Sequence, residues 1–115
     1  MIIKLPIRPL SVNAAWCGRR FKSKAYRAFE KEISVLLLPY KEKITGYCAV
    51  LYRFHLKNWK KTDGDNCVKT VQDFIVKRGI IEDDRFIMRY VIEKVPSDRD
   101  FVEVEIEPIN YEETR

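Results

Sequence analysis

The amino-acid sequence predicts a single two-layer α+β (α/β) domain over residues 1–115, with the element order β-α-β-α-β-β, a mixed sheet and two helices. Three observations support this prediction. The chain has 115 residues, the length of one ordinary domain. Hydrophobic residues make up 46% and charged residues 34% of it, a globular composition. Segments whose apolar residues alternate are interleaved with segments whose apolar residues recur at helical spacing.

The first strand is predicted over Ile2–Ile7, and residues 9–22 are expected to be irregular. A helix follows, from an N-cap at Ser23 to about Leu38, and Pro39 ends it. Its apolar residues fall on one face, which predicts packing on a core: Tyr26, Phe29, Ile33, Leu36 and Leu37.

The second strand is predicted over residues 47–56, where apolar and polar residues alternate and His55 lies on the polar side. A second helix is predicted over residues 66–78, with Asp65 or Asn66 as its cap and Gly79 at its end. Two further strands, joined by a turn, complete the sheet: residues 86–95 and 101–107.

The charge is unevenly distributed along the chain. The net charge is +5, but residues 1–29 carry seven basic side chains and no acidic one, whereas residues 101–115 have a net charge of −4. A basic segment of this kind predicts a polyanionic partner.

Several protein classes are excluded by composition. No apolar run approaches the ~18 residues of a membrane span, and residues 1–10 lack the apolar core of a secretory signal. Cys17, Cys48 and Cys67 are odd in number and lack CxxC spacing, which excludes a disulfide scaffold and a zinc site. Three thiols are typical of a reducing compartment, and we expect a cytoplasmic protein.

Carboxylates are concentrated between residues 63 and 84. If residues 62–65 are extended, Asp63 and Asp65 project to the same side. Lys69 lies one helical turn after Asp65, and Asp84 begins a strand that could pair near the first acidic loop. Oxygen ligands of this kind suit Mg²⁺ or Mn²⁺ and indicate metal-dependent phosphodiester hydrolysis.

A purely structural interpretation is also open. Asp65 could only cap a helix, Lys69 could only pair with Asp65 and Asp73 for roughly 0.3–0.5 kcal/mol, and Asp83-Asp84 could only form a turn. Two features weigh against it. Two neighbouring carboxylates are unfavourable without a counter-ion, and they would repel the polyanion that the basic segment attracts.

The stretch Asp63-Gly64-Asp65-Asn66-Cys67-Val68-Lys69, followed by Asp73 and Ile81-Glu82-Asp83-Asp84, resembles the D-x-D-N-x-x-K and D-D signature of the RusA family of Holliday junction resolvases. The early Pro9, Ser11 and Asn13, the small size and the element order extend the resemblance over nearly the whole chain. The chain departs from the family pattern at Gly64, often an apolar position, which is expected to loosen the loop.

The resemblance implies an Mg²⁺-dependent endodeoxyribonuclease that resolves four-way junctions by paired cleavage in DNA recombination and repair. It also implies a homodimer, with no other protein partner and no membrane attachment expected, and the family's frequent association with prophages points to a phage origin. It implies that Asp63, Asp65 and Asp84 bind Mg²⁺, with Mn²⁺ as a substitute, and that Lys69 is the catalytic lysine.

Residues near the acidic loop and in the basic segment are candidates for contacts with DNA phosphates: Arg8, Asn13, Arg19, Arg20, Lys22, Lys24, Lys60 and Lys61. Trp16, Phe21 and Trp59 either pack in the core or stack on unpaired bases. Two alternative functions stay open: a non-catalytic DNA-binding module of the same fold, and an Mg²⁺ nuclease acting on other branched DNA or on RNA.

Overall fold

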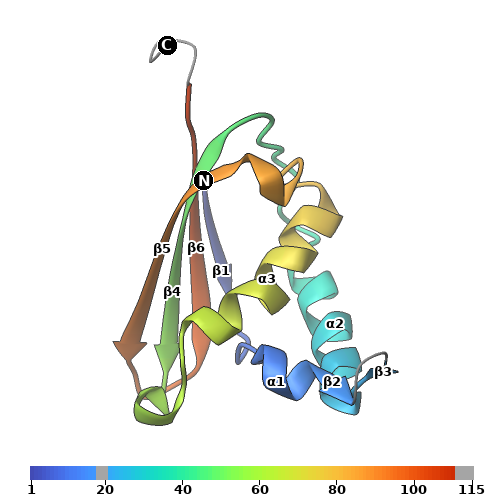
Figure 1. Cartoon of the computed structure of the whole chain (residues 1–115), viewed down its shortest axis with the longest axis vertical. Coiled ribbons are helices and arrows are strands. Elements are labelled where there is room, and N and C mark those ends of the chain that lie inside the picture. The colour runs from blue at the N-terminus through green and yellow to red at the C-terminus, as the bar shows by residue number, and fades with distance from the viewer. Residues whose placement is uncertain (18–20, 111–115) are drawn as a thin grey trace.

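The structure, a computed structural model, describes residues 1–17 and 21–110 and consists of a mixed sheet covered on one face by helices (Figure 1). The strands of the main sheet are β1 (Ile2–Leu5), β4 (Cys48–Leu56), β5 (Ile87–Pro96) and β6 (Phe101–Pro108). The helices are α1 (Val12–Ala15), α2 (Lys24–Leu36) and α3 (Asp65–Arg78), with 3-10 turns η1 (Trp59–Lys61) and η2 (Asp84–Phe86). The predicted two-layer α+β class is therefore confirmed.

The strand order is β1-β6-β4-β5, in which only β4 and β5 are parallel. Parallel strands need a crossover, and here α3 makes it across one face of the sheet. The end of β4 therefore lies level with the end of β5, as the pairing of Leu56 with Pro96 shows. Residues that follow β4 and residues that precede β5 consequently lie at opposite ends of the sheet.

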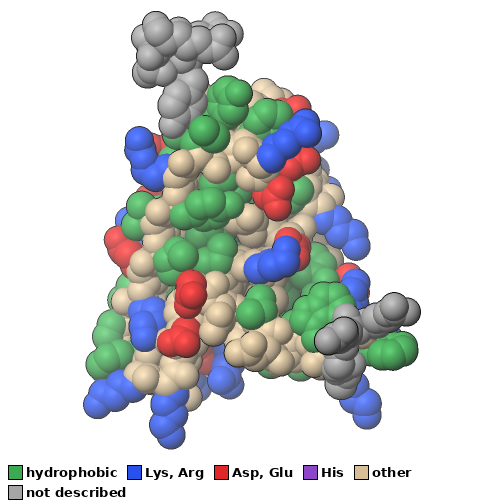
Figure 2. Space-filling view, in the orientation of Figure 1, with side chains coloured by type: hydrophobic (Ala, Val, Ile, Leu, Met, Phe, Trp, Pro, Cys, Tyr) green, Lys and Arg blue, Asp and Glu red, His purple; other side chains and the backbone are tan. Residues whose placement is uncertain are grey.

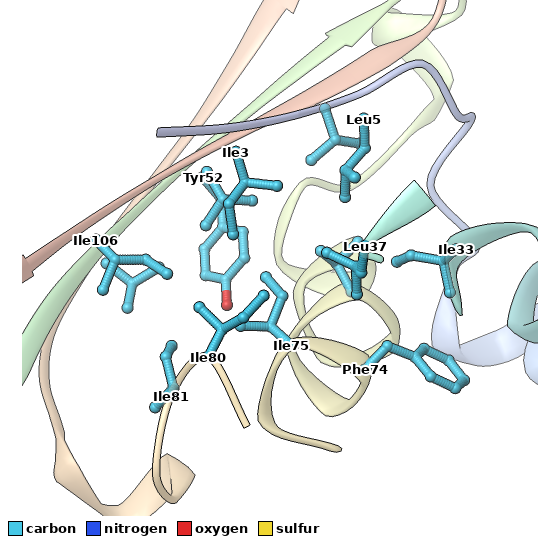
Figure 3. Close-up of a cluster of buried hydrophobic side chains, with 14 of the residues drawn as sticks. Ile3, Leu5, Ile33, Leu37, Tyr52, Phe74, Ile75, Ile80, Ile81 and Ile106 are labelled. Atoms are coloured by element: carbon cyan, nitrogen blue, oxygen red, sulfur yellow. The ribbon is translucent and has the colours of Figure 1, made fainter. Parts of the chain in front are cut away.

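The core lies between the sheet and the helices, and Figure 3 shows part of it. Alternate residues of β4 point inward and are buried, from Cys48 to Leu56, and the helix α2 contributes Phe29 and Ile33. The Tyr52 hydroxyl donates to Gln72 Oε1 at 2.8 Å, so the polar atoms at the centre of the core are satisfied. Burial is the largest of the causes that raise the pKa of Tyr52.

The outer face of the sheet carries ion pairs between strands. Arg53 of β4 lies 3.4 Å from Glu93 of β5 and 3.4 Å from Glu105 of β6. His55 contacts Glu103 at 2.5 Å and stacks on Phe101, which confirms that it belongs to the polar face. Part of the acidic C-terminal segment is therefore paired with basic groups of the sheet.

The predicted irregular segment 9–22 is wrong, because it contains α1 and a two-stranded sheet of β2 (Trp16–Cys17) and β3 (Phe21–Lys22). Residues 1–17 and 21–110 thus contain three α-helices rather than two. Ser11 caps α1 by accepting a hydrogen bond from the Ala14 N–H at 3.2 Å. A helix of four residues is too short to show helical periodicity in a sequence.

The two edges of the sheet differ in their exposure. At β1, the Tyr40 hydroxyl accepts from the Lys4 N–H at 3.0 Å and donates to the Lys4 carbonyl at 3.3 Å, and Pro6 follows the strand. At the other edge, β5 has ten residues, most of them exposed. No described helix is long and apolar enough to cross a membrane.

Candidate active site

The acidic loop, residues 62–65, connects η1 with α3 and presents Asp63 and Asp65 to solvent. Thr62 is extended, but Gly64 has helical dihedral angles (φ −61°, ψ −38°), so the predicted extended run ends before Gly64. Asp65 is the first residue of α3, where the positive end of the helix dipole favours an anion.

The two carboxylates of the acidic loop are not used for capping. Gly64 occupies the N-cap position without a side-chain bond, so the prediction that Asp65 or Asn66 caps the helix is wrong. Among the described residues, neither Asp63 nor Asp65 has a hydrogen-bond or ion-pair partner for its carboxylate. Both are therefore available to a ligand.

Contacts with β5 hold the acidic loop in place. Lys94 Nζ donates to the carbonyl oxygens of Trp59 and Thr62, at 2.8 Å each. A Cβ atom at Gly64 would lie 3.2 Å from Ile92 Cγ2 and 3.3 Å from Lys94 Cγ. Glycine at this position therefore permits a close approach to β5, in place of the looser loop expected from the sequence.

The negative charge of the loop affects the neighbouring thiol. Burial, followed by the charge of Asp65, raises the pKa of Cys67 to about 11, and Asp63 contributes in the same direction. The negative charges of Asp63 and Asp65 thus both reach the Cys67 thiol in the first turn of α3. Arg8, which lowers the pKa of the same thiol, brings positive charge to this place.

Lys69 lies one helical turn after Asp65 and its Nζ atom is 3.3 Å from Asp73 Oδ1. Both side chains are exposed, and an exposed i,i+4 pair contributes only about 0.3–0.5 kcal/mol. This ion pair was one of the structural alternatives for Lys69, and it is weak enough to yield to a phosphate.

Asp83 and Asp84 lie at the other end of the sheet, so the predicted pairing near the acidic loop is wrong within one copy of the chain. The physical reason is the parallel crossover: Asp84 precedes the start of β5, whereas Asp65 follows the end of β4 (Figure 1). Asp83 caps η2 by accepting from the Arg85 N–H at 3.0 Å, and this bond holds its pKa below the ordinary value. Asp84 is exposed.

No cluster of three His, Cys, Asp or Glu side chains that could hold a metal ion occurs within the described part of one chain. One copy therefore brings Asp63 and Asp65 together at the start of α3. Asp84 is separated from them by about the length of β4, a strand of nine residues that rise roughly 3.3 Å each.

Basic residues flank the acidic loop. Lys60 and Lys61 lie on η1, directly before it, and are exposed. Figure 2 shows basic side chains around the lower end of this face and acidic side chains above them, near the start of α3. Lys22, Lys24 and Asn13 are also exposed, around α1 and the start of α2. Arg19 and Arg20 lie outside the described residues.

Three aromatic side chains near these basic residues are exposed. The exposed fraction is 47% for Trp16, 70% for Phe21 and 36% for Trp59, so core packing does not account for them. Lys60 Nζ lies over the Trp59 ring, 5.5 Å from its centroid.

A cleft of about 700 Å³ opens beside Asp63, between the segment that links β1 to α1, the helix α2 and the start of α3. Its polar lining includes Arg8, Asn13, Asn58 and Asn66. Asn58 and Lys94 could not be identified from the sequence, because an asparagine in a turn and a lysine in a strand have no distinguishing spacing. Asn66 was predicted only as a helix cap and as part of the family signature.

Comparison with known proteins identifies related nucleases. The model of the family described as endodeoxyribonuclease RusA matches residues 7–107. The chain is also similar to a protein of Lactococcus phage r1t named crossover junction endodeoxyribonuclease rusA. The two are 29% identical over 96 residues, which cover 82% of this chain and 70% of the phage protein.

Proposed function

This chain belongs to the RusA family of endodeoxyribonucleases, a family of Holliday junction resolvases, and from that premise we propose that it cuts four-way DNA junctions by Mg²⁺-dependent hydrolysis of paired phosphodiester bonds. The observation that supports this most directly is the pair of carboxylates Asp63 and Asp65, which have no partner in the described part of the chain and lie on a loop flanked by basic side chains.

The side chains of the acidic loop fit a hard divalent cation. Mg²⁺ is bound in proteins through one or two carboxylates and keeps several waters, and both carboxylates here are exposed and unpartnered among the described residues. Asp63 and Asp65 would hold the ion, and Mn²⁺ would substitute for it. An ion held there would supply an activated water and charge stabilisation at the phosphate oxygens.

The neighbouring basic groups bind and orient the DNA strand. Lys60 and Lys61 contact phosphates on one side of the acidic loop, which positions the strand without reading its sequence. Lys69, one turn along α3, exchanges its weak contact with Asp73 for the scissile phosphate and stabilises the negative charge that develops there.

We infer that the active unit is a homodimer in which Asp84 of the partner subunit completes the site. Asp84 of the same chain lies at the far end of the sheet and cannot reach Asp63 and Asp65. A two-fold axis that reverses the direction of the sheet would bring it there. Two such sites would then serve the two opposed strands of a junction.

The strand β5 is the surface best suited to this dimer. It lies at the edge of the sheet, carries ten residues, and has at one end Asp84 and at the other Lys94, which binds the acidic loop. Antiparallel pairing with its own copy about Val91 places Arg89 opposite Glu93 of the partner subunit, on the same face. It also brings the start of β5 in one copy to the end of β5 in the other.

Junction cleavage tests the proposed activity. The wild-type protein is expected to nick a synthetic four-way junction in Mg²⁺ and to leave it intact in EDTA. Asp65→Asn should retain junction binding and lose cleavage. Glu42→Gln, which neutralises an exposed carboxylate between α2 and β4, outside the acidic loop, should cut normally. Binding without cleavage in both Mg²⁺ and Mn²⁺ would refute the catalytic function and favour a non-catalytic DNA-binding module.

Mixing two inactive variants tests whether the site is shared. In a heterodimer of Asp65→Asn and Asp84→Asn, one of the two shared sites has both wild-type carboxylates, so nicking on one strand should reappear. If each site is built from one chain, no combination of these subunits restores activity. Homodimers of each variant, carried through the same denaturation and refolding, are the controls.

Competition between substrates tests the remaining alternative. We propose that a four-way junction competes better than duplex DNA, flap DNA or RNA of equal length, because two sites related by a two-fold axis match its symmetry. A role in DNA recombination and repair, in the cytoplasm of a bacterial or phage-infected cell, would follow from that preference.

A further inference from the structure

We propose that the cleft beside Asp63 binds one nucleotide of the cut strand with its base turned out of the helical stack. This inference rests on the proposed nuclease function and extends it by assigning a base-binding pocket next to the scissile phosphate. The cleft has a volume of about 700 Å³, within the range of sites that enclose a small organic ligand.

The walls of the cleft suit the flat face of a base. Pro9 and Phe29 contribute buried apolar surface, one from the segment after β1 and the other from α2. Three residues that line the cleft from α1 and α2 have short side chains, which leaves room in it: Ala14, Ala25 and Ala28. The same helices also contribute Asn13, Phe29 and Glu32 to the lining. A phosphate alone would need neither this volume nor an apolar wall.

The rim of the cleft suits the polar edge of a base. Asn13, Asn58 and Asn66 line it, and among the described residues none of their side-chain amides has a hydrogen-bond partner. An amide offers a donor and an acceptor side by side, the pattern that reads base edges. These three amides come from α1, from the turn between β4 and η1, and from the first turn of α3.

The position of the cleft connects the base to the chemistry. Asp63 belongs to the acidic loop and also lines the cleft, so a nucleotide in the cleft would have its phosphate beside the carboxylates. Arg8 and Lys61 also line the cleft and offer positive charge to that phosphate. Unstacking costs a few kcal/mol in a duplex and least where a base is already unpaired, as at the crossover of a junction.

Fluorescence of 2-aminopurine tests the proposal directly. Junctions carrying 2-aminopurine at single positions around the crossover are bound to Asp65→Asn protein in EDTA, so that the DNA stays uncut. We expect a several-fold rise in fluorescence at one position next to the cleavage site and none at positions in the arms. Junction binding with no rise at any position would overturn the base pocket while leaving the nuclease function intact.

Filling the cleft provides the matched variant. Ala28→Phe, made in the Asp65→Asn background, should bind the junction without the fluorescence rise. In the otherwise wild-type chain it should slow cleavage on the order of 10²-fold. Ser34→Phe adds the same side chain to an exposed position of α2 outside the cleft and should change neither. A rise that persists in Ala28→Phe would refute the proposal.

Sequence preference offers a readout that does not depend on Ala28→Phe folding. Asn13→Ala should change which base is preferred at the unstacked position, measured by sequencing the cut ends of a junction library randomised there, with a smaller change in the overall rate. An unaltered preference in Asn13→Ala, Asn58→Ala and Asn66→Ala would overturn the base-reading role. Failure of the wild-type protein to bind any junction would instead refute the proposed function.

Discussion

The two edge strands of the sheet, β1 and β5, differ in how far their backbone is covered. An edge strand leaves backbone N–H and C=O groups unpaired, and natural proteins cover or interrupt such edges. At β1 the chain does this itself, because the Tyr40 hydroxyl occupies the N–H and C=O of Lys4 and Pro6 follows. At β5 ten residues run along the edge, and the exposed apolar ones include Met88, Tyr90, Val91 and Ile92.

This difference favours β5 over β1 as the surface for the proposed dimer. β1 has only four residues, and its inward side chains Ile3 and Leu5 are fully buried. β5 has apolar side chains on both of its faces, exposed by 39–49%. It also has Asp84 at one end and the acidic loop at the other. The β1 edge is therefore covered by its own chain, whereas the β5 edge is exposed and can pair with another strand.

The largest expected effect comes from a charge at the centre of the open edge. Val91→Asp places two carboxylates against each other on the two-fold axis, so the dimer should dissociate and junction cleavage should be lost with it. Light scattering coupled to size exclusion measures the mass. Ile2→Asp, the matched change at an exposed apolar residue of β1, should keep both dimer and activity. A dimeric, active Val91→Asp protein would contradict the interface.

A smaller effect is expected from the charges that flank the axis. Arg89→Glu sets Glu against Glu93 of the partner subunit, twice in each dimer, and should weaken the dimer by roughly 1–2 kcal/mol, or about 5- to 30-fold in Kd. Analytical ultracentrifugation over a dilution series measures the shift. Lys4→Glu makes the same charge change on β1 and should leave the dimer unaffected; equal weakening by both variants would indicate a general charge effect.

The sequence carried most of the fold because its elements are long enough to show a period. Alternation in residues 47–56 and 101–107 predicted β4 and β6 within a residue or two, and the stripe containing Phe29 and Ile33 predicted α2. The predictions failed where geometry is set by tertiary contacts. The four-residue helix α1 is too short to show a period. The close packing of Gly64 against Ile92 is a contact between distant segments, which local sequence does not reveal.

The candidate site was predicted in part for a related reason. Asp63, Asp65 and Lys69 lie within seven residues, so local spacing alone brings them to the start of one helix. The position of Asp84 depends on whether β4 and β5 run parallel, which residue spacing does not encode. The sequence therefore identified the carboxylates but could not show that one chain separates them.

Removing the Tyr40 hydroxyl tests how the closed edge is maintained. Tyr40→Phe deletes both hydrogen bonds to the backbone of Lys4, so the free energy of unfolding should fall by about 0.5–1.5 kcal/mol. Urea denaturation monitored by tryptophan fluorescence measures it. Junction cleavage by the folded protein should be unchanged, because β1 lies at the far edge of the sheet from β5. Unchanged stability would show that water replaces the hydroxyl at this edge.

The smallest effect is expected from the same deletion at the open edge. The Tyr90 hydroxyl accepts a hydrogen bond from Gln72 Nε2 at 3.1 Å and makes no hydrogen bond to edge backbone within residues 1–17 and 21–110. The Tyr90 side chain is half exposed. Gln72 is buried and held by Tyr52, but because the Tyr90 side chain is half exposed, a water molecule can replace its hydroxyl beside the Gln72 amide in Tyr90→Phe. Unfolding in urea should therefore shift by only about 0.5 kcal/mol, the lower limit for one hydrogen bond. A loss of unfolding free energy as large as that of Tyr40→Phe would mean that a tyrosine hydroxyl stabilises β5 as much as it stabilises β1. The two edges would then differ only in their exposure.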